Sequence, residues 1–260
     1  MEKITSLQNN LIKHAQALRE PRERRETGMT VIDGAREIKR AMEAGVILNK
    51  VFYVEAHQAA LLKQLSYQKI ELIEVSDKVM EKLAYGDRHE GILALAEIPN
   101  LTLKDLKLSS HPLVVVLEAL QKPGNLGAIL RTCDGVGVEA VLVCDPKTDV
   151  YNPNVIRSST GVVFKLPVVS SNSEEIFAFL KSKKIKICAA SPGGQKTYTQ
   201  ANFKGAWALA LGSEDKGLSD FWPLAADLTV KIPMKGMADS LNVSISAAII
   251  LYEALRQRQN

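Results

Sequence analysis

The 260-residue sequence contains little cysteine and histidine, and this excludes several classes of site. The three cysteines, Cys133, Cys144 and Cys188, are an odd number without zinc or redox spacing, so we expect buried thiols and no disulfide framework. The four histidines are scattered along the chain, which indicates neither a metal cluster nor a catalytic triad. We therefore predict that the protein holds no metal.

Long apolar runs are also lacking, which excludes a membrane-spanning protein. No run approaches the ~20 residues that a membrane-spanning helix needs. The first residues, MEKIT, lack the apolar stretch of a secretory signal peptide. With 46% hydrophobic and 24% charged residues, the composition is typical of a globular protein. We expect a cytoplasmic protein made of one large domain or two smaller ones.

A strong excess of one charge is also missing, because the net charge is only +4. This value permits binding to nucleic acid without requiring it. The distribution is more informative: residues 1–25 contain six basic and three acidic side chains, and a second basic cluster consists of Lys181, Lys183, Lys184 and Lys186. Each cluster alone is typical of a solvated helix end or loop. Together, on a protein with a small-ligand pocket, they favour contacts with phosphates.

The order of strand-like and helix-like segments predicts an α/β fold in two parts. Residues 1–98 alternate between the two patterns and predict a small α/β module. Residues 99–112 are polar, begin and end with proline, and are predicted to be a linker. Residues 113–260 alternate again, with residues 162–169 predicted to be mainly extended. This alternation is typical of a parallel sheet with helices on both faces.

The last predicted helix, residues 241–256, has an unusual composition. Nearly every position from 243 to 255 is apolar or small. A helix that is apolar all round must be buried all round. It therefore either crosses the core or seals a subunit interface, and we favour the interface because the helix is terminal.

Three apolar, strand-like runs are interrupted by small or polar residues. The interruptions are residues 123–127 (PGNLG), followed by Arg131; residues 212–217 (GSEDKG); and residues 232–234 (IPM), followed by residues 240–244 (SLNVS). Such breaks leave backbone N–H and C=O groups free to meet a ligand. Because ligands bind beyond the strand ends of open α/β sheets, three breaks of this kind predict one shared pocket.

Side chains within the breaks suggest what the pocket binds. Asn125 supplies two amide donors and an acceptor, and Arg131 lies in the helix that follows. A helix N-terminus with a guanidinium suits a phosphodiester, although a glycine turn with a surface arginine is the simpler alternative. Glu214 comes immediately after a strand-like run. The simpler alternative for this residue is a polar cap on the next helix. Ser240 is a candidate N-cap of the last helix, whereas the Asn242 amide needs partners of its own.

With these three motifs in order and at fitting spacing, the sequence resembles the SpoU/TrmH family of RNA ribose 2′-O-methyltransferases, within the knotted methyltransferase superfamily. The resemblance covers residues 112–258 and includes a further stretch, residues 157–161 (RSSTG). Lys122 stands where family members often carry an acidic residue. Residues 1–98 resemble the RNA-binding module of the family, which is similar to small α/β ribosomal proteins.

The resemblance implies a parallel sheet whose C-terminal segment forms a deep trefoil knot, and a homodimer formed through the last helix. It also implies S-adenosylmethionine as the cofactor, held in the knot. The family's cofactor contacts fall on Gly212, Ile232 and Leu241, with Leu211 and Met234 beside them. The backbone would bind the adenine edge and the ribose, and the apolar side chains would pack on the ring faces.

The implied reaction transfers the sulfonium methyl group to a ribose 2′-hydroxyl, and its catalytic positions match Asn125, Arg131, Glu214, Ser240 and Asn242. Because a guanidinium does not readily accept a proton, we interpret Arg131 as stabilising the developing alkoxide and the neighbouring phosphate. Glu214 would act as a base or orient Arg131. Ser240 and Asn242 would orient the ribose and the cofactor loop.

Ribosomal RNA is favoured over transfer RNA as the substrate, because the N-terminal module resembles one used on ribosomal targets. Three alternatives stay open at this point: a tRNA ribose methyltransferase, a knotted methyltransferase acting on a base nitrogen, and a non-catalytic RNA-binding protein of the same fold. Binding of S-adenosylmethionine separates the last of these from the enzymes.

Overall fold

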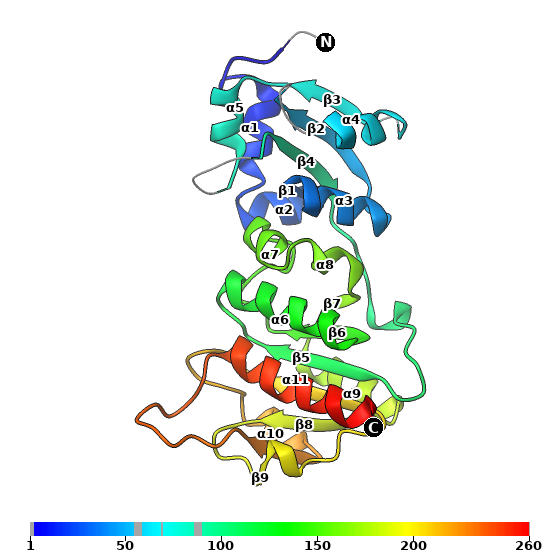
Figure 1. Cartoon of the computed structure of the whole chain (residues 1–260), viewed down its shortest axis with the longest axis vertical. Helices are drawn as coiled ribbons and strands as arrows, with labels where there is room; N and C mark the ends of the chain where they lie inside the picture. Colours follow the sequence, from blue (N-terminus) through cyan, green and yellow to red (C-terminus); the bar gives the residue numbers. More distant parts are fainter. Residues whose placement is uncertain (1–2, 55–58, 69, 86–89, 260) are drawn as a thin grey trace. The chain divides into compact units, whose positions relative to one another are not determined.

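The computed structural model describes residues 3–54, 59–68, 70–85 and 90–259 (Figure 1). The chain divides into two compact units. The first unit combines Met1–Asn100 with Tyr151–Lys165, and the second combines Leu101–Val150 with Leu166–Asn260. The predicted division at residues 99–112 thus lies close to the first change of unit, but Tyr151–Lys165 groups with the N-terminal part of the chain.

The first unit is built on a mixed sheet, four-stranded in its described residues, with the order β1-β4-β2-β3. Its central strand β4 is antiparallel to both neighbours, and β2 runs parallel to β3. The strands are β1 (Met29–Asp33), β2 (Leu48–Tyr53), β3 (Glu71–Glu74) and β4 (Ile92–Glu97). The helices are α1 (Asn10–Ala17), α2 (Pro21–Thr27), α3 (Ala35–Glu43), α4 (Ala59–Ser66), α5 (Asp77–Leu83), α7 (Pro153–Ser158) and α8 (Val162–Lys165).

Helices α1 and α5 close the core of this unit, and both begin with side-chain caps. The Asn9 side chain accepts a hydrogen bond from the backbone of α1, and the Ser76 hydroxyl accepts one from α5. Buried residues of both helices, including Ile12 and Met80, form one apolar cluster with Phe52 and other strand residues. This core depends only on residues of the N-terminal segment.

The N-terminal basic stretch serves this fold more than the sequence suggested. The fully buried Arg24 donates hydrogen bonds to the carbonyls of Leu18 (2.8 Å) and Arg19 (2.7 Å). The Arg19 guanidinium in turn donates to three carbonyls at the C-terminal end of α5 and lies over the Tyr85 ring. The interpretation of the whole stretch as a phosphate-binding surface is therefore wrong for Arg24, because a buried guanidinium cannot contact RNA.

The segment Tyr151–Lys165 packs on α3 and β1. Arg40 of α3 donates to the carbonyl and hydroxyl oxygens of Thr160, both at 2.6 Å. Arg157 forms an ion pair with the nearly buried Asp33 at 3.3 Å. Residues 157–161, which the sequence places in the C-terminal domain, therefore belong to the first unit. The prediction of an extended segment at 162–169 is wrong for Val162–Lys165, which is helical because packing on α3 overrides the β-branched sequence.

Within Leu101–Val150 and residues 166–259, the second unit contains a seven-stranded sheet with the order β7-β6-β5-β10-β8-β11-β9. All neighbouring strands are parallel, which confirms the predicted parallel sheet. The strands are β5 (Leu113–Glu118), β6 (Ala140–Cys144), β7 (Val168–Ser171), β8 (Lys186–Ala190), β9 (Lys196–Thr197), β10 (Trp207–Leu211) and β11 (Leu228–Lys231).

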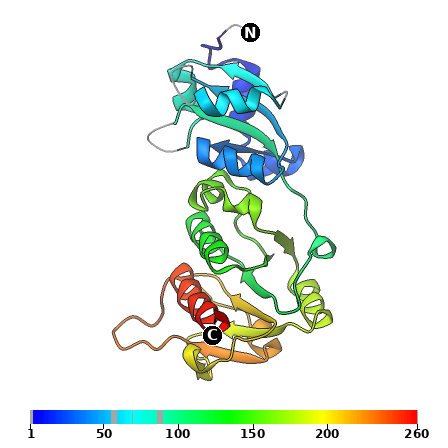
Figure 2. The ribbon, with the colours of Figure 1, turned by 45° about the vertical axis from the view of Figure 1, so that its right-hand side comes forward.

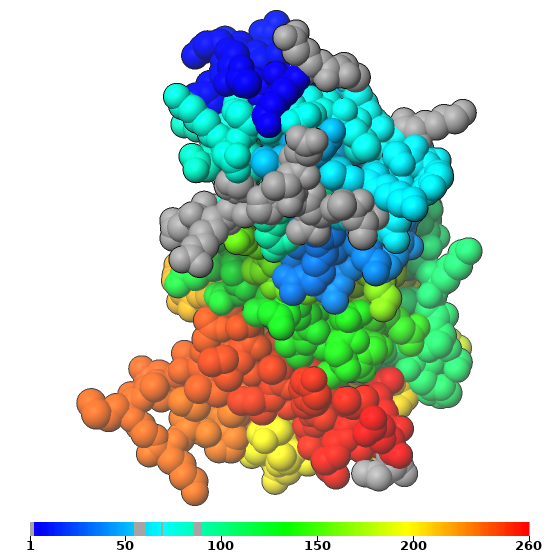
Figure 3. All heavy atoms as spheres, turned by 45° about the horizontal axis from the view of Figure 1, so that its top comes forward, coloured from blue at the N-terminus to red at the C-terminus, as the bar shows by residue number. Residues whose placement is uncertain are grey.

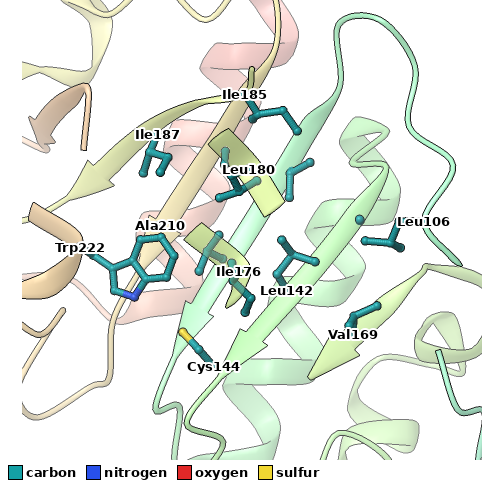
Figure 4. Packing of buried hydrophobic residues seen from close by; sticks show 14 residues of the cluster. Leu106, Leu142, Cys144, Val169, Ile176, Leu180, Ile185, Ile187, Ala210 and Trp222 are labelled. Atoms are coloured by element: carbon teal, nitrogen blue, oxygen red, sulfur yellow. The ribbon is translucent and has the colours of Figure 1, made fainter. Parts of the chain in front are cut away.

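Helices cover both faces of this sheet. On one face, α9 (Ser173–Ser182) and α10 (Phe221–Ala225) contribute Ile176, Leu180 and Trp222 to a cluster with alternate residues of the strands (Figure 4). On the other face, α6 (Pro123–Val136) and α11 (Val243–Gln259) pack against each other (Figure 2). The two-fold alternation of side chains along each strand supplies both cores, since every residue of β5 is buried.

Strand β11 lies between two strands that are consecutive along the chain. It pairs with β8 on one side and β9 on the other, so residues 191–195 pass around it. The approach is close: a Cβ atom at Gly194 would lie 2.3 Å from the Val230 carbonyl carbon. Beyond β11, α11 ends where the Arg258 side chain donates to the carbonyls of Phe203 and His111. The end of α11 is thus held against the residues that precede β5 and β10.

Three sequence predictions concern membrane spans, metal sites and cysteines rather than the fold. Among the described helices, none is long and apolar enough to cross a membrane. The described residues contain no group of three or more histidine, cysteine or acidic side chains placed to hold a metal ion, and His57 and His89 lie outside the described ranges. The three cysteines are free and buried, as predicted.

We predict that Gly161→Ala destabilises the first unit more than Gly45→Ala does. Both glycines adopt left-handed backbone angles, φ +79° and +77°, where alanine costs about 1–2 kcal/mol. A Cβ at Gly161 would also lie 3.1 Å from Glu37 Cα, whereas a Cβ at Gly45 meets no described atom within 4 Å. Chemical denaturation of both variants measures the difference, and equal losses of unfolding free energy would contradict close packing of α8 on α3.

Candidate active site

A cavity of about 400 Å³ opens at the C-terminal ends of β8, β10 and β11. Its walls are the connections that follow these strands, together with the first turns of α11. The segment between β11 and α11, orange in Figure 3, forms one wall and extends outward to the fully exposed Met237. The volume is within the range of small-molecule sites, and the position is where open α/β sheets bind ligands.

The wall after β10 is a tight turn that depends on two glycines. The backbones of Ser213 and Gly217 exchange two hydrogen bonds, each 3.0 Å long, and Gly217 has a left-handed φ of +69°. A Cβ atom at Gly212 would lie 2.0 Å from the Gly217 carbonyl carbon, so a larger residue does not fit there. The turn directs Glu214 away from the strand, toward α6.

Glu214 cross-links this turn to the start of α6. Its carboxylate accepts hydrogen bonds from the Asn125 side-chain amide (2.6 Å) and from the backbone N–H groups of Gln121 (3.2 Å) and Lys122 (3.4 Å). Burial raises the pKa of Glu214, but these bonds and one from its own backbone outweigh burial, so the pKa lies below its ordinary value. A carboxylate with a lowered pKa is a weak base, which favours an orienting role.

Asn242 connects the third break to the same group. Its side-chain oxygen accepts from the Ser244 backbone (2.9 Å) and hydroxyl (2.6 Å), and its amide donates to the Asn125 side-chain oxygen (3.2 Å). Asn242 therefore caps α11, and the prediction of Ser240 as the N-cap is wrong, because the helix starts at Val243. A chain of donors runs from Ser244 through Asn242 and Asn125 to Glu214.

Arg131 lies elsewhere on α6. Helix α6 begins at Pro123, because proline suits the first turn of a helix. Arg131 is consequently about two turns from the helix start, and its side chain points about 120° away from that of Asn125. It is exposed and is not one of the described residues that line the cavity. The pairing of helix start and guanidinium around one phosphate therefore stays a prediction, and the described anion at the helix start is the Glu214 carboxylate.

The other sequence-derived site residues lie in the cavity wall. The lining includes Leu211, Gly212, Ile232, Met234 and Leu241, the five residues named from the family's cofactor contacts, and it also includes Ser240. The sequence reasoning missed the connection after β8, which contributes Ala190, Ser191 and Pro192. The signal was present, because residues 191–194 (SPGG) interrupt another apolar strand.

Two family models match the chain. A model described as the SpoU rRNA Methylase family matches residues 112–252. A model described as the MRM3-like substrate binding domain matches residues 9–94. The methylase match corresponds to the second unit, and the substrate-binding match corresponds to the first unit. The exception is the segment Tyr151–Lys165, which the methylase match includes but which belongs to the first unit in the structure.

Individual proteins resemble the chain over nearly its whole length. A 23S rRNA (uridine(2479)-2′-O)-methyltransferase from Streptomyces viridochromogenes is 31% identical, over 98% of this chain and 92% of the relative. A crystal structure of an RNA 2′-O ribose methyltransferase is 42% identical and has a TM-score of 0.88, covering 100% of both chains. The SpoU methyltransferase AviRb from Streptomyces viridochromogenes, in complex with AdoMet, is 29% identical with a TM-score of 0.91, covering 97% of this chain and 99% of AviRb.

We predict that Glu214 stabilises the fold in a pH-dependent manner. Glu214→Gln places an amide NH₂ against N–H donors, so the variant should be less stable than the wild-type protein at neutral pH. Because the pKa is lowered in the folded state, the wild-type advantage is complete above the ordinary value of 4.5 and disappears as the pH falls through the folded value. Urea denaturation of both proteins from neutral to acidic pH measures this, and a pH-independent difference would contradict it.

Proposed function

The chain belongs to the SpoU family of rRNA methylases, and we propose that it transfers a methyl group from S-adenosylmethionine to a ribose 2′-hydroxyl of structured RNA. The observation that carries the proposal is that Glu214 and Asn242, which line the cavity from two separate segments, are hydrogen bonded through Asn125, which is not itself in the described lining. S-adenosylmethionine supplies an electrophilic methyl group on its sulfonium.

The cavity wall suits this cofactor. The side chains of Leu211, Ile232 and Leu241 offer apolar surface for the adenine faces, and the glycine turn at Gly212 brings backbone groups close to the ligand. Met234 and Ser240 complete the wall formed by the segment after β11. The cofactor-binding role of these residues rests on their position in the cavity.

The chemistry depends mainly on alignment. As the new C–O bond forms at the ribose, the C–S bond breaks to release S-adenosylhomocysteine and the hydroxyl proton passes to solvent. Holding the reactants in line supplies about 7–11 kcal/mol, more than the roughly 3–5 kcal/mol of a general base. We assign Asn125, Asn242 and Ser240 to positioning the ribose and the cofactor loop, and Glu214 to orienting Asn125. The assignment of Arg131 to the RNA phosphate and the developing alkoxide rests on the family's motif alone, since its exposed guanidinium is outside the described cavity lining.

Ribosomal RNA is the proposed substrate. The first unit matches a substrate-binding domain, and the relative with 31% identity is named for methylation of 23S rRNA. Of the basic residues near the N-terminus, Lys13 and Arg25 are exposed and available to phosphates. An rRNA substrate places the proposed activity in the cytoplasm.

We further propose that the second unit contains the trefoil knot expected for the family. The support is β11, which lies between β8 and β9 while residues 191–195 pass around it. The segment after β11 then leads to α11, which is held at its end by Arg258. The cofactor cavity is formed by the same segments.

A homodimer through α11 is also proposed. The helix is not buried all round in the single chain: Val243, Ala247 and Leu251 are buried, whereas Ile245 and Tyr252 on the opposite side are half exposed. Ile249 lies between these two on the same side and is partly buried. This apolar outer face, next to the small residues of α6, suits a second copy of the chain.

We predict that Ile245→Arg converts the dimer to monomers, because it places a charge in the middle of an apolar interface. The matched control is Leu224→Arg, which changes a similarly exposed apolar residue on α10 and should leave the dimer intact. Sedimentation velocity of the three proteins measures the mass. A wild-type protein that sediments as a monomer would rule out this interface.

We predict that the wild-type protein methylates unmodified ribosomal RNA and that Arg131→Lys lowers the turnover, because a lysine lacks the planar fork of donors. One missing transition-state contact typically costs about 10²–10³-fold in rate. Labelled S-adenosylmethionine and total unmodified RNA provide the assay, and resistance to alkaline cleavage maps the modified nucleotide. Affinity for S-adenosylmethionine is the internal control, because Arg131 does not belong to the described cavity lining.

Three outcomes would change the proposal. Methylation of a base nitrogen, or of transfer RNA alone, would replace the substrate. Cofactor binding without methylation of any RNA would favour a non-catalytic protein. Near-normal turnover of Arg131→Lys would remove the assignment of its guanidinium.

A further inference from the structure

A second carboxylate, Glu118, connects the same two segments as Glu214, the β5–α6 connection and the loop after β10. Glu118 stands at the start of the β5–α6 connection, whereas Glu214 belongs to the loop after β10. Glu118 is the last residue of β5, directly before the connection to α6, and it is 6% exposed. Its two carboxylate oxygens accept hydrogen bonds from the backbone N–H and the hydroxyl of Ser219, both at 2.7 Å. Ser219 ends the loop that begins at Gly212, so Glu118 holds the end of the wall that carries Glu214.

The two carboxylates form reciprocal cross-links. Glu118 extends from the first loop to Ser219 in the second, and Glu214 extends from the second loop to Gln121, Lys122 and Asn125 in the first. Each loop therefore donates hydrogen bonds to a carboxylate of the other. The separation of the two loops is therefore fixed at both ends of the loop that follows β10.

The backbone around Glu118 and Ser219 is fixed by other contacts. Ala119 has a left-handed φ of +53°, which is unfavourable for a residue with a Cβ, and its N–H donates to the Cys144 carbonyl (2.9 Å). On the other side, the fully buried Trp222 anchors the chain three residues beyond Ser219 in the core. Glu118 thus links two fixed points, and the loop between Gly212 and Ser219 forms part of the wall of the cavity.

Stability alone gives little reason for a carboxylate at this position. Burying a carboxylate is unfavourable unless its oxygens are hydrogen bonded, and an apolar residue in the core avoids this cost. What the carboxylate adds is direction, because two charge-assisted bonds to one residue define its position and orientation. Glu118 is not among the described residues that line the cavity, so it does not contact the cofactor there.

We propose that Glu118 is a positioning residue for the methyl transfer. By accepting two hydrogen bonds from Ser219, it fixes the position of the loop between Gly212 and Ser219. This loop in turn places Glu214 against Asn125 and Gly212 against the cofactor. The inference rests on the proposed function for its effect on methyl transfer, whereas its effect on the loop is independent of that function.

The chain offers a matched control in Glu139. Its two oxygens also accept from one serine, Ser109, through the backbone N–H (2.7 Å) and the hydroxyl (2.6 Å). Glu139 directly precedes β6, so it lies at the N-terminal end of the strands, opposite to the cavity. Glu118→Ala and Glu139→Ala therefore remove the same kind of contact, close to the cavity wall in one case and remote from it in the other.

The experiment compares the two variants with the wild-type protein by three measurements. Hydrogen exchange without cofactor should become faster in residues 212–219 of Glu118→Ala, and not in Glu139→Ala. The dissociation constant for S-adenosylmethionine should rise and kcat on ribosomal RNA should fall, each about tenfold, as expected for a lost hydrogen bond to a charged group. Thermal unfolding shows that each variant is folded at the assay temperature.

Ser219→Ala keeps the inference testable if Glu118→Ala does not fold. It removes the hydroxyl bond and retains the backbone bond, so it should give smaller shifts in the same direction. The inference is overturned if folded Glu118→Ala shows wild-type exchange in residues 212–219 and wild-type cofactor affinity. Cofactor binding without RNA methylation by the wild-type protein would instead contradict the proposed function and leave the exchange result decisive.

Discussion

The site depends on one hydrogen bond, from the Asn125 side-chain amide to the Glu214 carboxylate (2.6 Å). Without it, Glu214 would still accept from Gln121 and Lys122, but the side chain of Asn125, and with it Asn242, would lose its hydrogen bond to the loop after β10. The Asn242 amide adds the third segment by donating to Asn125, and the same residue caps α11. Local helix capping and long-range assembly of the cavity therefore use the same side chain. A carboxylate in this position remains ionised, because its neighbours stabilise the charge.

The sequence predicted the sheet and the place of the site because both follow from short-range patterns. Alternation of apolar strands and helices indicates a parallel sheet, and polar interruptions at strand ends indicate where its ligand edge lies. The residues 212–217 and 240–244 were identified in this way, and the structure places Glu214, Ser240 and Asn242 at one cavity. The missed residues, such as Ser191, follow the same rule but lie in a strand connection without a charged side chain.

Other features could not be predicted, because they depend on tertiary contacts. The sequence around Arg24 does not indicate that its guanidinium folds back onto the carbonyls of Leu18 and Arg19 and is fully buried. In sequence, the segment Tyr151–Lys165 comes between two strands of the C-terminal sheet, β6 and β7. In the structure it contacts Arg40 and Asp33 and belongs to the first unit. The composition of α11 indicated burial without showing that one side, with Ile245, is left exposed. In each case tertiary contacts, not local propensity, decide the result.

The position of β11 also has a consequence for how the protein is made. This strand and α11 follow the other described strands in the chain, but β11 inserts between β8 and β9, and both elements line the cavity. During synthesis the N-terminal sheet of residues 29–97 can form first, while the cavity cannot form until β11 has been released from the ribosome. Pairing of β11 with two strands that precede it in the chain requires non-local contacts, which are slow to form. The nascent protein can therefore form its first sheet well before it can hold a methyl donor.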